Sequence, residues 1–223
     1  MISNSKPFKI GIDASNLKQG GGLTHLFEII TSIDLKKHNF SKVIIWGNEK
    51  LFLEIDDYSW LKKLSPSALN SGLLKQFIWR KYKLSDEAIQ EECDLLFIPG
   101  GTYNCSFKPV VLMSQNMLPF KWNELLRYKL SWATIRLILL RWIQSNSIRK
   151  ADGVIFLTNY AKEEVQKVIG DIPGLVSVIP HGINNRFFHK VKKQYPIESY
   201  NVGDPYRIIY VSGIHPYKHQ CNV

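Results

Sequence analysis

The sequence predicts an α/β protein with a Rossmann-like parallel sheet that carries helices on both faces. Its predicted strands are continuous apolar runs, which is typical of parallel strands buried on both sides. Segments with helical spacing separate these runs, as expected for a doubly wound sheet. Unusual polar and glycine-containing loops follow the strands, at the edge where open parallel sheets bind their ligands.

The first strand is predicted over residues 8–14, where the chain alternates and then turns at Ser15 and Asn16. The later strands are short apolar runs that end near Gly, Pro or Asn. They cover residues 43–46, 94–98, 109–113, 153–157 and 176–179. Residues 51–70 carry only short, mixed patterns.

The first helix is predicted from Leu23 onward, because apolar residues recur there at helical spacing. Further helices are predicted over residues 73–83, 123–149 and 160–169, the last ended by Gly170. These elements complete one α/β domain over residues 1–190.

A second domain is expected to begin near the end of the chain. Residues 191–205 hold Lys, Pro, Gly and Asn with little apolar content, which is typical of a linker. Residues 206–212 have the pattern of a buried strand, and a turn containing Lys218 follows. We therefore expect residues 206–223 to form the first strand and turn of a second, truncated domain.

Composition indicates a soluble globular protein, with 45% hydrophobic and 22% charged residues. Three Cys without a C-x-x-C pair favour reduced thiols and a cytosolic setting. No signal peptide or membrane-spanning run is predicted. The net charge of +10 favours nucleic acid, anionic lipid or phosphorylated partners, although a merely basic surface accounts for it equally well.

The loop after the first strand is the first candidate site. It runs from Asp13 and Asn16 to the consecutive glycines Gly20, Gly21 and Gly22, and His25 lies one turn into the following helix. Glycines let a backbone approach a ligand closely, and a helix start presents N–H groups to an anion. The spacing is not G-x-G-x-x-G, so a dinucleotide site is weakly supported. The alternative is a flexible loop followed by a structural His.

Three further loops follow predicted strands. Gln115 and Asn116 come after residues 109–113, and they either point into a cleft or form a turn. Thr158 either faces the cleft or caps the next helix. His181 either lines the cleft or is a surface His beside a glycine turn.

The predicted helix over residues 123–149 has two apolar stripes, edged by Arg127, Lys129, Arg136 and Arg141. One stripe holds Leu125, Tyr128, Trp132, Ile135, Leu139, Trp142 and Ile143, and the other holds Leu126, Leu130, Ala133, Leu137 and Leu140. One stripe suffices to pack on a sheet, so the second is expected to meet a membrane interface or a partner. The alternative is a helix packed between the sheet and its neighbours.

Three motifs together resemble retaining glycosyltransferases of family 4, which have the GT-B fold. They are Asp13-Ala-Ser with Gly20-Gly-Gly22-Leu-Thr, Ile179-Pro-His-Gly-Ile183, and Tyr210-Val-Ser with Tyr217-Lys218-His. The last is similar to members that build bacterial surface polysaccharides. The resemblance implies two facing Rossmann-like domains, an acceptor site in the first, and a nucleotide-sugar site mostly in the second. It implies no metal or other cofactor.

The resemblance also assigns roles to residues. Gly20, Gly21 and Gly22 would lie near the donor diphosphate, and Lys218 would neutralise it as it leaves. Where the family often has a His that orients sugar or acceptor, this chain has Gln115, so Gln115 and Asn116 are the catalytic candidates. The family's usual Arg before the Lys is Gly213 here. The remaining acceptor or cleft candidates are Asp13, Asn16, His25, Thr158 and His181.

The expected function is therefore that of the N-terminal part of a glycosyltransferase in bacterial surface glycan synthesis. It would help move a sugar from a nucleotide sugar to a lipid-linked or polysaccharide acceptor, in the cytoplasm at the inner face of the plasma membrane. The chain alone is expected to be inactive, because the donor site would lie beyond Lys218. The alternative is a non-enzymatic basic module that binds nucleic acid or a protein. Nucleic acid is not expected, because exposed aromatics are only weakly interleaved with Lys and Arg.

Overall fold

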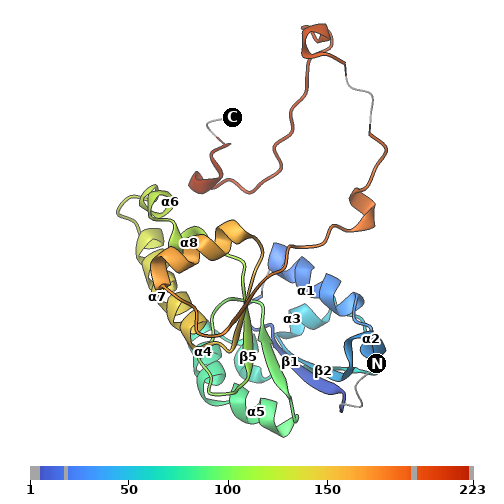
Figure 1. Cartoon of the computed structure of the whole chain (residues 1–223), viewed down its shortest axis with the longest axis vertical. Coiled ribbons are helices and arrows are strands. Elements are labelled where there is room, and N and C mark those ends of the chain that lie inside the picture. The colour runs from blue at the N-terminus through green and yellow to red at the C-terminus, as the bar shows by residue number, and fades with distance from the viewer. Residues whose placement is uncertain (1–5, 18–19, 192–194, 221–223) are drawn as a thin grey trace.

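The computed structural model describes residues 6–17, 20–191 and 195–220 (Figure 1). Within them, an all-parallel sheet of seven strands lies between helices, which confirms the predicted Rossmann-like α/β class. The strand order is β3-β2-β1-β4-β5-β6-β7. Connections run outward in opposite directions from β1 and β4, so these two strands flank the switch point at which such sheets bind ligands.

The strands recover all six runs predicted for the first domain and add β3 within residues 51–70. They are β1 (Phe8–Asp13), β2 (Phe40–Trp46), β3 (Leu61–Leu64), β4 (Leu95–Ile98), β5 (Val110–Ser114), β6 (Gly153–Phe156) and β7 (Leu175–Val178). The helices are α1 (Gly21–Thr31), α2 (Leu35–His38), α3 (Glu49–Phe52), α4 (Leu73–Tyr82), α5 (Leu84–Gln90), α6 (Trp122–Leu126), α7 (Trp132–Lys150) and α8 (Asn159–Ile169).

Apolar clusters cover both faces of the sheet, as continuous apolar strands require. Under α1, Leu26 and Ile30 pack with alternate residues of β2. On the other face, helices α4, α5, α7 and α8 pack on a larger cluster that contains Trp46 and Trp79. Both indole N–H groups donate to the Glu87 carboxylate, at 2.8 and 2.9 Å.

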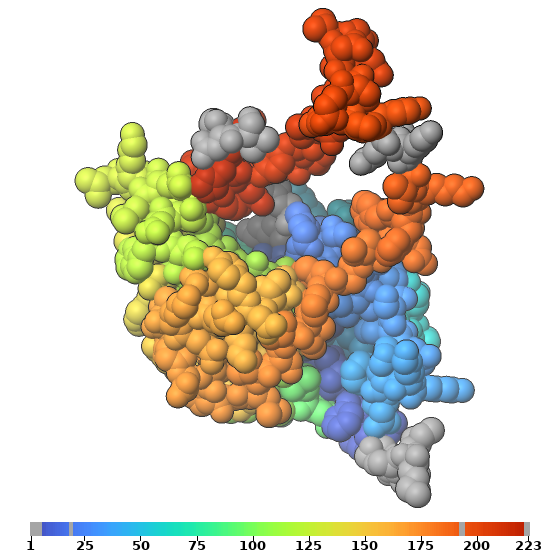
Figure 2. All heavy atoms as spheres, turned by 45° about the horizontal axis from the view of Figure 1, so that its top comes forward, coloured from blue at the N-terminus to red at the C-terminus, as the bar shows by residue number. Residues whose placement is uncertain are grey.

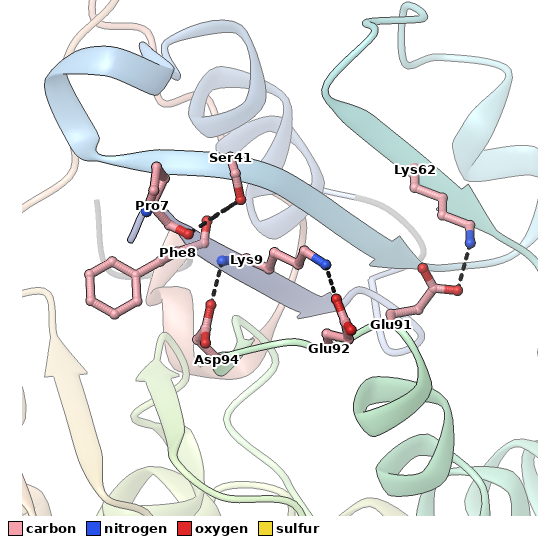
Figure 3. Close-up of polar contacts among 8 residues, drawn as sticks. All are labelled: Pro7, Phe8, Lys9, Ser41, Lys62, Glu91, Glu92 and Asp94. Atoms are coloured by element: carbon pink, nitrogen blue, oxygen red, sulfur yellow. Dashed lines mark hydrogen bonds and ion pairs between the residues drawn. The ribbon is translucent and has the colours of Figure 1, made fainter. Parts of the chain in front are cut away.

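Polar contacts hold the strands together at the edge opposite their carboxyl ends (Figure 3). The Lys9 N–H donates to Asp94 at 2.8 Å, and the Lys9 ammonium pairs with Glu92. Lys62 pairs with Glu91 at 2.6 Å. These contacts tie β1 and β3 to the segment that enters β4, and they leave the carboxyl edge free for a site.

The continuous helix predicted over residues 123–149 is wrong, because the chain breaks between α6 and α7. Lys129 has a φ of 52°, in the left-handed region, which ends the first helical segment. The Ser131 side chain then caps α7 by accepting the Thr134 N–H. The break changes which residues share a helix face. The two predicted apolar stripes are therefore not continuous from α6 to α7.

The strand predicted over residues 206–212 is also absent. These residues have no regular structure and are mostly exposed, because no neighbouring strand is present among the described residues to pair with them. The segment turns back on itself, where the Tyr210 hydroxyl donates to the Lys218 carbonyl at 2.7 Å. His219 then reaches Glu124 of α6 at 3.3 Å. Residues 192–194 of the predicted linker and 221–223 of the predicted second domain lie outside the described residues.

Removing residues 204–223 is expected to leave the thermal unfolding midpoint almost unchanged and to improve solubility. The pair that His219 of this segment forms with Glu124 of α6 lies at the surface and is worth less than about 1 kcal/mol, and the exposed apolar residues of the segment invite self-association. Calorimetry and light scattering on the shortened chain measure both effects. A large drop in the midpoint would show that the segment packs on the first domain more tightly than its contacts indicate.

Candidate functional site

A pocket of about 990 Å³ opens at the carboxyl edge of the sheet, between α1 and the segment that follows β7. Gly21, Gly22 and His25 line it from α1, Gln115 from the loop after β5, and residues 181–187 from beyond β7. Figure 2 shows this last segment, in orange, against α1, in blue. The structure thus brings five residues predicted from separate loops into one pocket: Gly21, Gly22, His25, Gln115 and His181.

The glycine turn leaves the start of α1 open. Gly20 has a φ of 82°, which favours glycine, and no side chain caps the helix. The first turn of α1 holds no acidic residue. A Cβ on Gly22 would lie 3.2 Å from Leu17 Cδ2 and 3.5 Å from Gln115 Oε1. A side chain at this position would therefore press on Leu17 and enter the pocket, and the open helix start suits an anionic or hydrogen-bonding ligand.

Two histidines form one wall of the pocket. The rings of His25 and His181 lie 4.2 Å apart at 62°, an edge-to-face contact that joins α1 to the segment after β7. Burial, and to a lesser extent His181, hold the pKa of His25 below its usual value. The native chain therefore binds fewer protons here than the unfolded chain. This contact loses stability as the pH falls below about 6.5, where an unperturbed His becomes protonated.

The lowered pKa keeps the His25 imidazole neutral over a wider pH range, and a neutral imidazole nitrogen can accept a hydrogen bond from a hydroxyl group. His25 Nδ1 is buried and has no hydrogen-bond partner within the described part of the chain. Buried polar atoms usually have a partner, so this nitrogen is free for a ligand or a water.

The rim combines charge, amide and aromatic groups that the sequence did not single out. The Asn184 amide donates to Glu28 Oε1 at 3.1 Å, which fastens the segment after β7 to α1. The Arg186 guanidinium lies over the Phe187 ring at 4.9 Å. A carboxylate, amides and an exposed aromatic ring are groups that bind a polyhydroxylated ligand by hydrogen bonds and ring stacking. The signal available for Asn184, Arg186 and Phe187 was their position directly after the motif at 179–183.

Two predicted cleft residues have structural roles beside the pocket instead. Asp13 is almost fully buried and accepts the Ser15 N–H at 3.0 Å, and burial raises the pKa of its carboxyl. Asn16 donates to Thr102 Oγ1 at 3.0 Å and packs against Gly100. These contacts shape the loops after β1 and β4, and neither residue lines the pocket.

Two other candidates take the local role that was left open as the alternative. Asn116 Oδ1 accepts the Leu118 N–H at 3.1 Å, which forms a turn, and Thr158 caps α8 by accepting the Ala161 N–H at 3.0 Å. Gln115, by contrast, is held at the pocket by a hydrogen bond from its amide to the Pro99 carbonyl at 3.3 Å.

The structure does not bring Lys218 into the pocket. Lys218 lies in a short turn beside the residue that contacts α6, with its ammonium 5.2 Å from the Tyr217 ring centre. Gly20 lies at the pocket's edge without lining it. The residues predicted to bind the donor diphosphate, Gly20–Gly22 and Lys218, therefore do not lie together in this conformation.

Among the basic residues predicted to face a membrane, Arg141 is engaged by the chain itself. Its guanidinium donates to the Pro119 and Phe120 carbonyls and lies over the Trp122 ring at 4.6 Å. Arg127 pairs with Glu124 at 2.9 Å but stays half exposed. Lys129 and Arg136 are exposed.

Within the described residues, no cluster of three or more His, Cys, Asp or Glu side chains has the geometry of a metal site. None of the described helices has the length and apolarity needed to cross a bilayer. A scan of protein-family models and a search of curated proteins returned no match for the chain.

Proposed function

We propose that this chain is the acceptor-binding, N-terminal part of a retaining, metal-independent glycosyltransferase. It would act on a lipid-linked or polysaccharide acceptor in bacterial surface glycan synthesis, at the inner face of the plasma membrane. The observation that carries the proposal is that residues of two of the three motifs that suggested it line one pocket. Glu28 and Asn184, 156 positions apart, are hydrogen-bonded across its rim.

The pocket has the chemistry that an acceptor requires. Sugar hydroxyls need acceptors and donors placed in a partly apolar wall, and His25, Gln115 and His181 supply them beside Leu157 and Ile183. In the transfer, the bond between the sugar C1 and the donor diphosphate breaks, a bond from C1 to the acceptor oxygen forms, and the proton of that acceptor hydroxyl passes to the leaving diphosphate. The open start of α1 is suited to the negative charge that develops on the leaving diphosphate.

Lys218 enters the proposal only through the resemblance. It would reach the diphosphate once residues 206–218 fold as the first strand and turn of a donor domain. That folding would bury the apolar residues of this segment that are exposed here.

The proposal is tested by sugar transfer. Residues 1–223 alone are expected to transfer no label from UDP-, GDP- or dTDP-sugars to a bacterial lipid or glycan extract. A protein that continues past residue 223 into a donor domain is expected to transfer it. Turnover by residues 1–223 alone would contradict the assignment as an acceptor half, and failure of the longer protein with every donor would contradict the enzyme assignment.

A further inference from the structure

Helix α7 packs inward with its polar side. Thr134, Gln144, Ser145 and Ser147 are buried together with Ile148. The Ser147 hydroxyl accepts the Tyr103 N–H at 3.0 Å and is also 3.1 Å from the Tyr103 carbonyl, so this helix is fastened to the loop after β4 by hydrogen bonds. An ordinary surface helix buries its apolar side, and here most of that side is left outward.

The outward side of α7 is a row of large apolar side chains. Trp132 and Trp142 are 78% and 66% exposed, with Ile135 and Leu139 between them at the spacing of one helix face. Leu126 and Leu130 are also exposed, at the end of α6 and in the α6–α7 connection, which projects as the lime-coloured knob in Figure 2. We call these six residues the α7 face. Contiguous exposed apolar surface of this kind marks an interaction site.

The charged residues of the segment that contains α6 and α7 are nearly all positive. Residues 121–150 hold seven Lys or Arg and one acid, Glu124, which is engaged by Arg127 and His219. Lys129 and Arg136 lie exposed beside the apolar row. An apolar strip with a cationic border complements a surface that is apolar inside and anionic at its edge.

We propose that the α7 face docks on an anionic lipid surface. The exposed Trp132 and Trp142 suit the boundary between head groups and acyl chains, where indole rings concentrate. Basic side chains beside them reach lipid phosphates while their stems stay apolar. The inference rests on the proposed function for its biological setting, because it names the surface that would hold the proposed transferase at the membrane. Lipid binding itself requires no sugar transfer.

The test is co-flotation of the 223-residue chain with phosphatidylcholine vesicles, with and without phosphatidylglycerol. Binding is expected to require phosphatidylglycerol and to fall as salt is raised, because charge attraction is screened within about 10 Å. Replacing Arg127, Lys129 and Arg136 by Gln should weaken binding on the order of a hundredfold, since each charge contributes roughly a factor of five. Replacing Trp132, Leu139 and Trp142 by Gln should weaken it at least about tenfold.

Two control variants remove the same number of basic or exposed apolar side chains elsewhere. Lys36, Lys37 and Lys50 supply the charge control, and the exposed Leu53, Leu73 and Leu175 supply the apolar one. Both control variants should bind like the unaltered chain. Equal loss in variant and control, or unchanged binding in both α7-face variants, would overturn the proposal, as would binding to a short RNA that vesicles fail to displace.

A second measurement does not depend on disruptive variants. Brominated phosphatidylglycerol should quench tryptophan emission in the unaltered chain, and Trp132→Phe with Trp142→Phe should remove most of that quenching while binding persists. Full quenching in the double variant would show that another surface enters the bilayer. Because these readouts need no donor or acceptor sugar, their failure is distinguishable from a failure of the transferase assignment.

Discussion

Replacing Gly22 by Val is expected to reduce the affinity for a glycan or lipid-linked acceptor at least about tenfold. The new side chain would enter the pocket between Leu17 and Gln115, where a Cβ alone already lies 3.2 and 3.5 Å from their atoms. A tenfold loss corresponds to about 1.4 kcal/mol, a modest effect for a branched side chain placed in a binding site. Calorimetric titration of both proteins with the same acceptor measures it.

The matched control for this variant is Gly72→Val. Gly72 precedes α4 outside the pocket, and a Cβ there meets no atom within 4 Å. It introduces the same side chain with no obstruction, so acceptor affinity should be unchanged. Equal affinities for all three proteins would show that the acceptor binds elsewhere.

Replacing Glu87 by Ala is expected to lower the free energy of unfolding by about 3 kcal/mol. This carboxylate accepts both the Trp46 and the Trp79 indole N–H groups, and both rings are buried. Its removal leaves two buried donors without a partner, at roughly 1–3 kcal/mol each before relaxation or water entry. Urea unfolding followed by tryptophan fluorescence gives the value.

The neighbouring residue provides the control. Asp86 lies exposed in the first turn of α5, so Asp86→Ala should cost only a few tenths of a kcal/mol through the helix dipole. A similar loss in both variants would mean that helix-end charge, rather than the two indole contacts, accounts for the effect.

Most strands were predictable, because a parallel strand that is buried on both faces of the sheet is a short run of apolar residues in the sequence. β4, β5, β6 and residues 43–46 of β2 follow that pattern, whereas β1 was predicted from its alternation. β3 was not predictable, because its four residues, Leu-Lys-Lys-Leu, include two Lys whose ammonium groups are satisfied by Glu91 and Asp57. Only tertiary partners make such a segment a strand.

The prediction of one helix over residues 123–149 was wrong because it depended on apolar periodicity alone. Its apolar spacing continues across the break, and the interruption depends on the Lys129 backbone and the Ser131 cap. Which side of α7 faces inward is decided by Ser147 and its hydrogen bonds to Tyr103, 44 positions away. The spacing of apolar residues does not predict the buried side of a helix that packs on the sheet through polar residues.

The candidate site was predictable where it depended on topology. Loops at the carboxyl ends of parallel strands meet, so Gly22, Gln115 and His181 were expected near one another. The contact between His25 and His181, and the link between Glu28 and Asn184, required coordinates because they join segments far apart in the sequence. Asn116 and Thr158 show the opposite outcome, since polar residues after strands equally often form turns and caps.

The central claim is that the pocket between α1 and the segment after β7 binds a sugar acceptor. The most direct test is a chemical-shift map of the 223-residue chain titrated with oligosaccharides, a polyprenyl-phosphate-linked sugar and, for comparison, a short RNA. The proposal predicts saturable shifts at Gly22, His25, Gln115 and His181 with a sugar acceptor and none there with RNA. Shifts at these residues with RNA alone, or none with any sugar acceptor, would contradict it.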